Sequence, residues 1–399
     1  MKFNLSTQIF VGILLGLIAG LILGHNASYI KPLGALFIRL LKMIIVPLIF
    51  ASVVMGVASI GDIRYLGRIG GKTLAYYLTT TGLSVLLGLV LVNLIRPGVG
   101  AEIGLSGVPE RLQKGPPSLL DTMMGIIPVN PFKALAEMDV LSIIAFALLF
   151  GGVLTTLGER GATILGFFDG LNEIMMRITA LVMRLAPIGV FALMADMVGS
   201  TGLDILQPLA KYMAVVLLGL FIHGVGTLPF LLWLVGRVHP LSFARHMSPA
   251  LATSFSTSSS SATLPLTMEC IEENAGVPNR VASFVLPLGA TVNMDGTALY
   301  ESVAALFIAQ AYGFPLTLSA QMVIFLTATL AAIGAAGIPG AGLVTMAIVL
   351  NAVGLPLEGI GLILAVDRVL DMCRTTVNVW GDAVGAAVIA RSEGDLLEA

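Results

Sequence analysis

The most constraining feature of this chain is a polar stripe inside a C-terminal segment that is otherwise apolar enough to cross a bilayer. The segment reads AVDRVLDMCRTTVNVWGDAVGAAVIA, and its stripe consists of Asp367, Asp371, Arg374, Thr375, Asn378 and Asp382. At about 100° per residue these side chains fall within an arc of roughly 100° on one helix face. Ionisable groups at membrane depth are costly and usually line a substrate or ion path. This helix is therefore predicted to be the chemical centre of the protein.

The composition places the whole chain in a membrane. It has 399 residues, of which 57% are hydrophobic and only 11% charged, with a mean hydropathy of +0.98. A soluble domain of this size cannot hide so much apolar surface. The net charge of −2 gives no reason to expect a nucleic-acid partner. Cys270 and Cys373 are too few for a disulfide framework, and Cys373, which lies away from the polar stripe, is interpreted as a packing residue.

Hydropathy predicts six spans before Pro240, and the basic residues orient them. The first is interpreted as a retained transmembrane helix rather than a signal peptide. Arg64, Arg68 and Lys72 follow the second span, and Arg237 and Arg245 follow the sixth, which predicts a cytoplasmic N-terminus. The polar stretch 97–139 is expected to be an external loop. The predicted spans are 8–24, 34–59, 74–95, 140–157, 165–196 and 207–236.

Two later segments are apolar at both ends and broken in the middle. Residues 247–271 contain a serine run, and residues 323–351 contain a break rich in Gly, Ala and Pro. Neither half is long enough to span a bilayer, so each segment is predicted to be a re-entrant helical hairpin whose tip is satisfied by protein or a water-filled cavity. Long helices, 279–312 and 357–391, are expected to follow them. This order predicts an inverted repeat with a binding site near the bilayer midplane.

The two hairpin tips carry different chemistry. Ser258 to Ser261 offer hydroxyls and N–H groups at a half-helix N-terminus, which suits an anionic group. The glycines of the second tip are candidate hinges of a gate, although tight packing through small residues is the alternative. These glycines are Gly334, Gly337, Gly340 and Gly342.

The segment after the first hairpin contains a candidate cation site. Asn293 and Asp295 are two residues apart, so on a regular helix they would face opposite sides. Both can reach one site only if the helix unwinds between them, which Gly289 and Gly296 favour. Freed carbonyls, a carboxylate and an amide oxygen form a hard-oxygen site that suits a small alkali cation. A structural kink with a protonated Asp295 is the alternative.

On the C-terminal helix, Arg374 is the best candidate to hold a substrate carboxylate, because its planar fork suits bidentate pairing. Asp371, three residues earlier, could hold an ammonium, so the pair predicts a dicarboxylic amino acid as substrate. An internal ion pair of Arg374 with Asp371 or Asp367 is the alternative, and it is compatible with substrate binding in the empty state. By contrast, His223 is interpreted as a satisfied scaffold histidine.

Four motifs in order, TSSSSATLP, NMDGTALY, GIPGAG and DMCRTTVNVWGDA, closely resemble the dicarboxylate/amino acid:cation symporters, the family of glutamate and aspartate transporters. The resemblance covers nearly the whole chain. It implies an all-α homotrimer with eight transmembrane helices and two hairpins, in the inner membrane of a prokaryote with both termini cytoplasmic. It also implies an elevator mechanism in which helices 3, 6, 7, 8 and both hairpins move against a scaffold of helices 1, 2, 4 and 5. The implied division is scaffold 1–73, transport helix 74–96, loop and scaffold 97–200, and transport domain 201–399.

The resemblance further implies a sodium-driven symporter of L-aspartate and L-glutamate with no organic cofactor. Arg374 would bind the side-chain carboxylate of the substrate and Asp371 its amino group. The remaining substrate contacts would come from Ser258, Ser259, Ser260, Thr297, Ile338, Gly342, Thr375 and Asn378. The sodium ligands would be Asp382, Gly289, Asn293 and Asn378 in a first site; Thr291, Ala332, Ile333 and Ala335 in a second; and Asp295, Asn293, Tyr77, Thr80 and Thr81 in a third.

One departure from the family concerns charge balance. Some members carry a second arginine beside the hairpin serines or just before the binding arginine, where this chain has Ser258 and Met372–Cys373. We therefore expect the carboxylates of the C-terminal helix to be less compensated, which leaves the ion coupling open.

Four other functions are alternatives to sodium symport. A proton-coupled carrier of the same fold would use Asp295 or Asp382 as the proton carrier. A C4-dicarboxylate carrier would leave Asp371 facing no ammonium, and a channel would not accumulate substrate. An intramembrane protease would need a base to activate a serine nucleophile. This chain has no histidine or lysine placed near the serine run, so it is not expected to be an enzyme.

Overall fold

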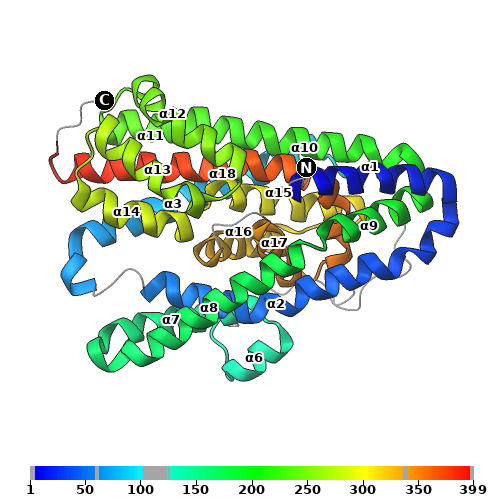
Figure 1. The fold of residues 1–399 in the computed structure, drawn as a ribbon, viewed down its shortest axis with the longest axis horizontal. Helices are drawn as coiled ribbons and strands as arrows, with labels where there is room; N and C mark the ends of the chain where they lie inside the picture. The colour runs from blue at the N-terminus through cyan, green and yellow to red at the C-terminus, as the bar shows by residue number, and fades with distance from the viewer. Residues whose placement is uncertain (1–4, 59–62, 102–123, 125, 336–339, 396–399) are drawn as a thin grey trace.

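The structure is a computed structural model that describes residues 5–58, 63–101, 124, 126–335 and 340–395, and every regular element in this part of the chain is helical (Figure 1). Short 3-10 and π segments connect or extend several helices. The α-helices are α1 (Leu5–Leu23), α2 (Lys31–Ala58), α3 (Ile63–Ile95), α6 (Pro131–Glu137), α7 (Val140–Thr156), α8 (Ala162–Met183), α9 (Ala186–Thr201), α10 (Leu206–Phe221), α11 (Leu228–Leu231), α12 (Pro240–Thr257), α13 (Ser260–Glu269), α14 (Asn279–Val292), α15 (Asp295–Ala311), α16 (Leu318–Ala331), α17 (Ala341–Ala352) and α18 (Ile360–Ser392).

Several of these helices could cross a membrane. Within the described residues, four are long and apolar enough, namely Thr7–Tyr29, Lys31–Ala58, Arg68–Ile95 and Gly202–Gly236. A bent pair, Gly158–Met183 with Ala186–Ser200, would make a fifth. The chain is thus an all-helical integral membrane protein by composition and fold, as the sequence predicted.

One predicted span is bent in the structure. The sequence suggested a single span over 165–196, but α8 and α9 meet at a bend of 50° around Arg184 and Leu185. Pro187 lies in the first turn of α9, where its missing N–H costs nothing. The proline therefore begins a new helix, and the apolar run forms two helices that point in different directions.

The two predicted hairpins appear as pairs of consecutive, mutually packed helices. In the first, α12 and α13 are joined at Ser258 and Ser259. This hairpin begins at Pro240, seven residues earlier than the sequence suggested, because that proline occupies the first turn of α12. In the second, α16 packs against α17; the predicted hinge Gly337 and substrate contact Ile338 lie outside the described residues.

Helix α18 lies at the centre of these packed elements. It contacts α10, α12, α14 and α15, while α3 packs against α15 (Figure 1). A second group forms around α2, which packs against α7, α8 and α9, and α9 also contacts α1. The polar face of α18 is consequently enclosed by helices instead of facing lipid.

Candidate functional site

The polar stripe of α18 is a single buried face. Each of its predicted members is at most 6% exposed, and Arg374 is fully buried. Such a set of charges is tolerated inside a protein only when the charges are paired. The stripe consists of Asp367, Asp371, Arg374, Thr375, Asn378 and Asp382.

Arg374 is held by both neighbouring carboxylates. Its Nη1 donates to Asp367 Oδ1 at 2.8 Å, and its Nε donates to Asp371 Oδ1 at 3.1 Å. The ring of Tyr300 lies against the guanidinium, with 4.1 Å between Cζ and the ring centroid. Nη2 is 2.9 Å from Asp371 Oδ1, but this contact is not aligned as a hydrogen bond. The internal ion pairs considered as an alternative are therefore present, and Nη2 is left to bond another acceptor.

The start of α17 closes over the same two charged residues. The Gly340 N–H donates to Asp371 Oδ2 at 3.1 Å, and Gly340 itself has φ +81°, which favours glycine. A side chain at Gly342 would begin 2.8 Å from Arg374 Nη2. The start of α17 therefore needs glycine here to approach the arginine so closely.

A second guanidinium, missed by the sequence analysis, also reaches Asp371. Arg368 Nη1 donates to Asp371 Oδ2 at 3.2 Å, and its side chain is only 14% exposed. The expectation of less compensated carboxylates left this cation out: Arg368 of α18 itself pairs with Asp371. The spacing of Arg368 and Asp371, three residues apart on one helix, was the available signal.

The predicted unwinding between Asn293 and Asp295 is confirmed. Helix α14 ends at Val292 and α15 begins at Asp295, with Asn293 and Met294 outside helical geometry. Asn378 of α18 organises the new helix start: its Oδ1 accepts from the Gly296 N–H at 2.8 Å and its Nδ2 donates to Thr297 Oγ1 at 3.1 Å. A side chain at Gly296 would begin 2.5 Å from the Arg374 carbonyl oxygen. The helices therefore cross at their backbones.

Asp295 lies at the centre of one polar cluster. Its Oδ1 accepts from Thr81 at 2.8 Å and from Thr80 at 3.2 Å. His223 Nε2 lies 3.1 Å from Oδ2, and both side chains are fully buried. The Nε2 of His223 is satisfied, as the sequence predicted, and its partner is Asp295, so the ring belongs to this carboxylate cluster.

Asp382 forms a neighbouring cluster. Its Oδ1 accepts from Asn293 Nδ2 at 2.9 Å, and a side chain at Gly289 would begin 2.4 Å from the same oxygen. The Tyr77 hydroxyl donates to the Val285 carbonyl at 2.7 Å and also lies against Gly289. The Tyr77 hydroxyl is thus placed beside Asp382, while the Tyr77 carbonyl accepts from the Thr80 hydroxyl of the Asp295 cluster at 3.3 Å.

The carbonyls of the second implied sodium site come from two packed segments. Thr291 lies on α14, which packs against the 3-10 turn Ala332–Gly334. The Ala332 carbonyl accepts from the Ala335 N–H at 3.4 Å, and the Ile333 carbonyl faces Gly56 of α2. The structure brings the two segments together. The carbonyls of Ala332 and Ile333 face other parts of the protein.

The tip of the first hairpin is built by its serines. Ser258 has φ +52° and ends α12, while Ser259 caps α13 by accepting from the Ala262 N–H at 3.1 Å. Ser258 and Ser260 are buried, and Ser258 Oγ has no hydrogen-bond partner in the described part of the chain. The tip therefore keeps an available hydroxyl, and both of its helices pack against α18.

Glu301 is a second residue that the sequence analysis missed. It is fully buried on α15, and neither of its carboxylate oxygens has a hydrogen-bond partner among the described residues. Thr345 and Arg374 are its polar neighbours. An ionised carboxylate in such surroundings is strongly disfavoured, so this side chain must carry a proton or face a cation.

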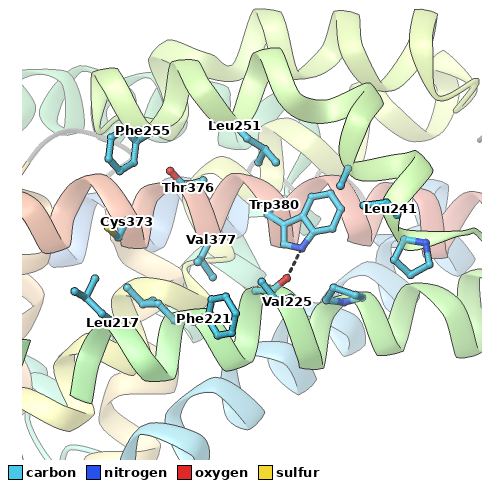
Figure 2. A pocket seen from close by; sticks show the side chains of 15 residues that line it. Leu217, Phe221, Val225, Leu241, Leu251, Phe255, Cys373, Thr376, Val377 and Trp380 are labelled. Atoms are coloured by element: carbon cyan, nitrogen blue, oxygen red, sulfur yellow. Dashed lines mark hydrogen bonds between the residues drawn. The ribbon is translucent and has the colours of Figure 1, made fainter. Parts of the chain in front are cut away.

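A large apolar cavity lies elsewhere in the described part of the chain. Figure 2 shows it as a groove with α18 as its floor and α10 and α12 as its walls, with a volume of about 650 Å³. Its polar groups are already bonded: the Trp380 indole N–H donates to the Gly224 carbonyl, and the Thr376 hydroxyl donates to the Met372 carbonyl. Cys373 packs against the hydrophobic core, as predicted, and also lines this groove. A charged substrate would find no partner there.

A helical membrane protein whose charged residues converge on broken helices has the architecture of a secondary carrier. The family model described as the sodium:dicarboxylate symporter family matches residues 5–392. The chain belongs to this family, and the resemblance drawn from the four motifs is confirmed.

Relatives in this family differ in their named substrates and driving ions. The chain is 38% identical to the proton/sodium-glutamate symport protein of Bacillus subtilis (strain 168), over 98% of this chain and 94% of that protein. It is 38% identical to the human excitatory amino acid transporter 3, over 97% and 85%. It is 39% identical to the C4-dicarboxylate transport protein of Rhodospirillum rubrum, over 97% and 89%.

Proposed function

We propose that this chain is a sodium-driven symporter of the acidic amino acids L-aspartate and L-glutamate. The observation that carries the proposal is the buried pair Arg374 and Asp371, over which α17 closes through Gly340 and Gly342. A guanidinium suits a carboxylate and a carboxylate suits an ammonium, and a dicarboxylic amino acid offers both. The Ser258 hydroxyl and Asn378 would receive its other carboxylate.

Sodium is favoured as the coupling ion by the chemistry of the two clusters behind this pair. Asp295 and Asp382 are surrounded by Thr80, Thr81 and Asn293, whose oxygens are hard ligands. A buried carboxylate needs a cation or a proton. Binding of sodium would require the threonine hydroxyls, which now donate to Asp295, to turn their oxygens toward the ion.

A proton-coupled carrier is the second candidate, and a specific observation favours it. Glu301 is buried without a hydrogen-bonding partner among the described residues, and the Bacillus relative is named for both protons and sodium. The two candidates differ in the gradient that drives uptake, so they can be separated directly.

Alternating access in this proposal follows an elevator mechanism. The group around α18, with α3, α10 and both hairpins, would move against the group around α2, α7, α8 and α9, which would also assemble the homotrimer in the cell membrane. The packing of each group within itself is consistent with such a division.

The test uses the purified chain in proteoliposomes. An inward sodium gradient without a pH difference should accumulate L-aspartate, and choline should abolish the uptake. Accumulation driven by a proton gradient alone, in sodium-free buffer, would show that the coupling ion is the proton and that the sodium assignment is wrong. Equilibration without accumulation would indicate a channel.

A further inference from the structure

The two oxygens of the Asp371 carboxylate have different partners. Oδ1 faces Arg374, the residue proposed to bind a substrate carboxylate. Oδ2 accepts from Arg368 Nη1 at 3.2 Å and from the Gly340 N–H at 3.1 Å. The position that an ammonium group would need beside Oδ2 is therefore held by a guanidinium of the protein itself.

The charges of this cluster balance before any substrate binds. Asp367 and Asp371 carry two negative charges, and Arg368 and Arg374 carry two positive charges. The four side chains are only 1–14% exposed, so an unpaired carboxylate here would be costly. When Arg374 turns to a substrate carboxylate, Arg368 still compensates Asp371. Asp371 therefore needs no substrate ammonium as its partner.

Arg368 reaches Asp371 through one nitrogen of its guanidinium. Its Nε is buried without a hydrogen-bond partner in the described part of the chain. Beside it lies a small cavity of about 30 Å³, lined by apolar residues of α1, the end of α8, and α9: Ile9, Met183, Ala186 and Val190. Among the described residues one hydrogen bond holds this side chain at Asp371, and an ammonium group at Oδ2 would have to replace it.

We infer that Arg368 is a specificity-determining residue that takes the place of the substrate ammonium at Asp371, so that this site accepts C4-dicarboxylates such as succinate as well as acidic amino acids. The inference rests on the proposed function of Arg374 and Asp371. It also removes the objection that a dicarboxylate would leave Asp371 without a partner. Arg368 positions and neutralises Asp371 and needs no contact with the substrate.

The test is calorimetric titration of the purified full chain with L-aspartate and with succinate in sodium buffer. The wild type should bind both ligands. Arg368→Met should weaken succinate at least about tenfold more than L-aspartate, because a charge-assisted bond is lost only where no ammonium replaces it. Arg368→Lys should restore much of the wild-type ratio between the affinities for succinate and for L-aspartate. Arg184→Met, at an exposed arginine beside the same helix bend, is the matched control and should leave the ratio as in the wild type.

A double variant separates charge balance from damage to the fold. Arg368→Met combined with Asp371→Asn removes both charges, so it should regain succinate binding while L-aspartate stays weak. Equal losses of both ligands in Arg368→Met, with no recovery in the double variant, would overturn the inference. A wild type that binds L-aspartate but not succinate would overturn it while leaving the proposed function intact. A wild type that binds neither L-aspartate nor L-glutamate would overturn the proposed function.

Discussion

Asn293 Nδ2 donates to Asp382 Oδ1 at 2.9 Å, which joins the unwound turn between α14 and α15 to the middle of α18. The same amide presents its Oδ1 to the Thr80 hydroxyl, 3.4 Å away in the Asp295 cluster. One side chain thus bridges the two buried carboxylate clusters. A cation that reorients Asn293 at one cluster changes a hydrogen bond at the other, which offers a physical route for coupling between ion sites.

Asp382→Asn tests the cation role of this bond. The amide oxygen introduced at position 382 can still accept from Asn293, so the fold should be retained while the charge is lost. We expect L-aspartate binding to need at least about tenfold more sodium, since charged ligands dominate affinity for a hard cation. Calorimetric titration of L-aspartate at several sodium concentrations measures this. The exposed Asp169→Asn is the matched control, and an identical sodium dependence in both variants would contradict the assignment.

Arg374→Lys tests recognition of the substrate carboxylate. Lysine keeps the positive charge between Asp367 and Asp371 but lacks the planar fork, so we expect a folded protein that binds L-aspartate about 10- to 100-fold more weakly. Truncation to alanine is a poorer test, because two buried carboxylates would lose their partner at a cost of about 3–5 kcal/mol in stability. Arg177→Lys, in an exposed pair with Glu173, should bind as the wild type does. Wild-type affinity in Arg374→Lys would remove Arg374 from the substrate site.

Sequence reasoning succeeded where the relevant spacing lies within one helix. The stripe of α18 follows from helical periodicity, and the break at Asn293 follows from two polar residues that cannot share a helix face. Both signals are local and need no knowledge of packing.

Two of the missed features depend on contacts between elements that are distant in the sequence. The third, Arg368, lies just outside the helix face that the sequence analysis considered. His223 reaches Asp295 from 72 positions away, and the hydroxyl of Tyr77 is directed by Val285 on another helix. Nothing in the sequence around His223 distinguishes a buried scaffold histidine from a cluster member. Arg368 was detectable, but it lies at the edge of the polar arc, and only the fold shows which carboxylate oxygen it meets.

Glu393→Gln tests the ionic tie at the end of α18. The Lys72 ammonium donates to the Glu393 carboxylate and, with Arg68 nearby at 3.2 Å, lowers its pKa. A carboxyl with a lowered pKa in the folded state stabilises the fold above its unfolded pKa, and this stabilisation is lost as the pH falls through the folded pKa. We expect Glu393→Gln to reduce the melting temperature slightly near pH 7 and to converge with the wild type in acid. The exposed Glu269→Gln is the control; parallel melting curves at every pH would show that the tie has no effect.

The groove in Figure 2 predicts unequal reactivity of the two cysteines. Cys373 lines the groove and is partly exposed, whereas Cys270 is 2% exposed in the core. We expect a lipid-soluble maleimide to label Cys373 in the folded protein and Cys270 only after denaturation, as followed by mass spectrometry. Leu217→Trp should slow the labelling, because Leu217 lines the groove next to Cys373 (Figure 2). Equal labelling rates for both thiols would contradict the placement of Cys373.

Glu301→Gln decides whether the buried carboxyl of α15 carries a transported proton. Glutamine has nearly the same shape and no charge, so the variant should be at least as stable as the wild type if Glu301 is protonated in the folded state. If Glu301 releases its proton during the transport cycle, uptake by the wild type should respond to an imposed pH gradient and uptake by Glu301→Gln should not, while both remain sodium-driven. Proteoliposomes with a fixed sodium gradient and a varied internal pH measure this difference. The same pH response in both proteins would exclude Glu301 as the carrier and leave Asp295 and Asp382 as the remaining candidates, in which case Asp382→Asn should abolish the response instead.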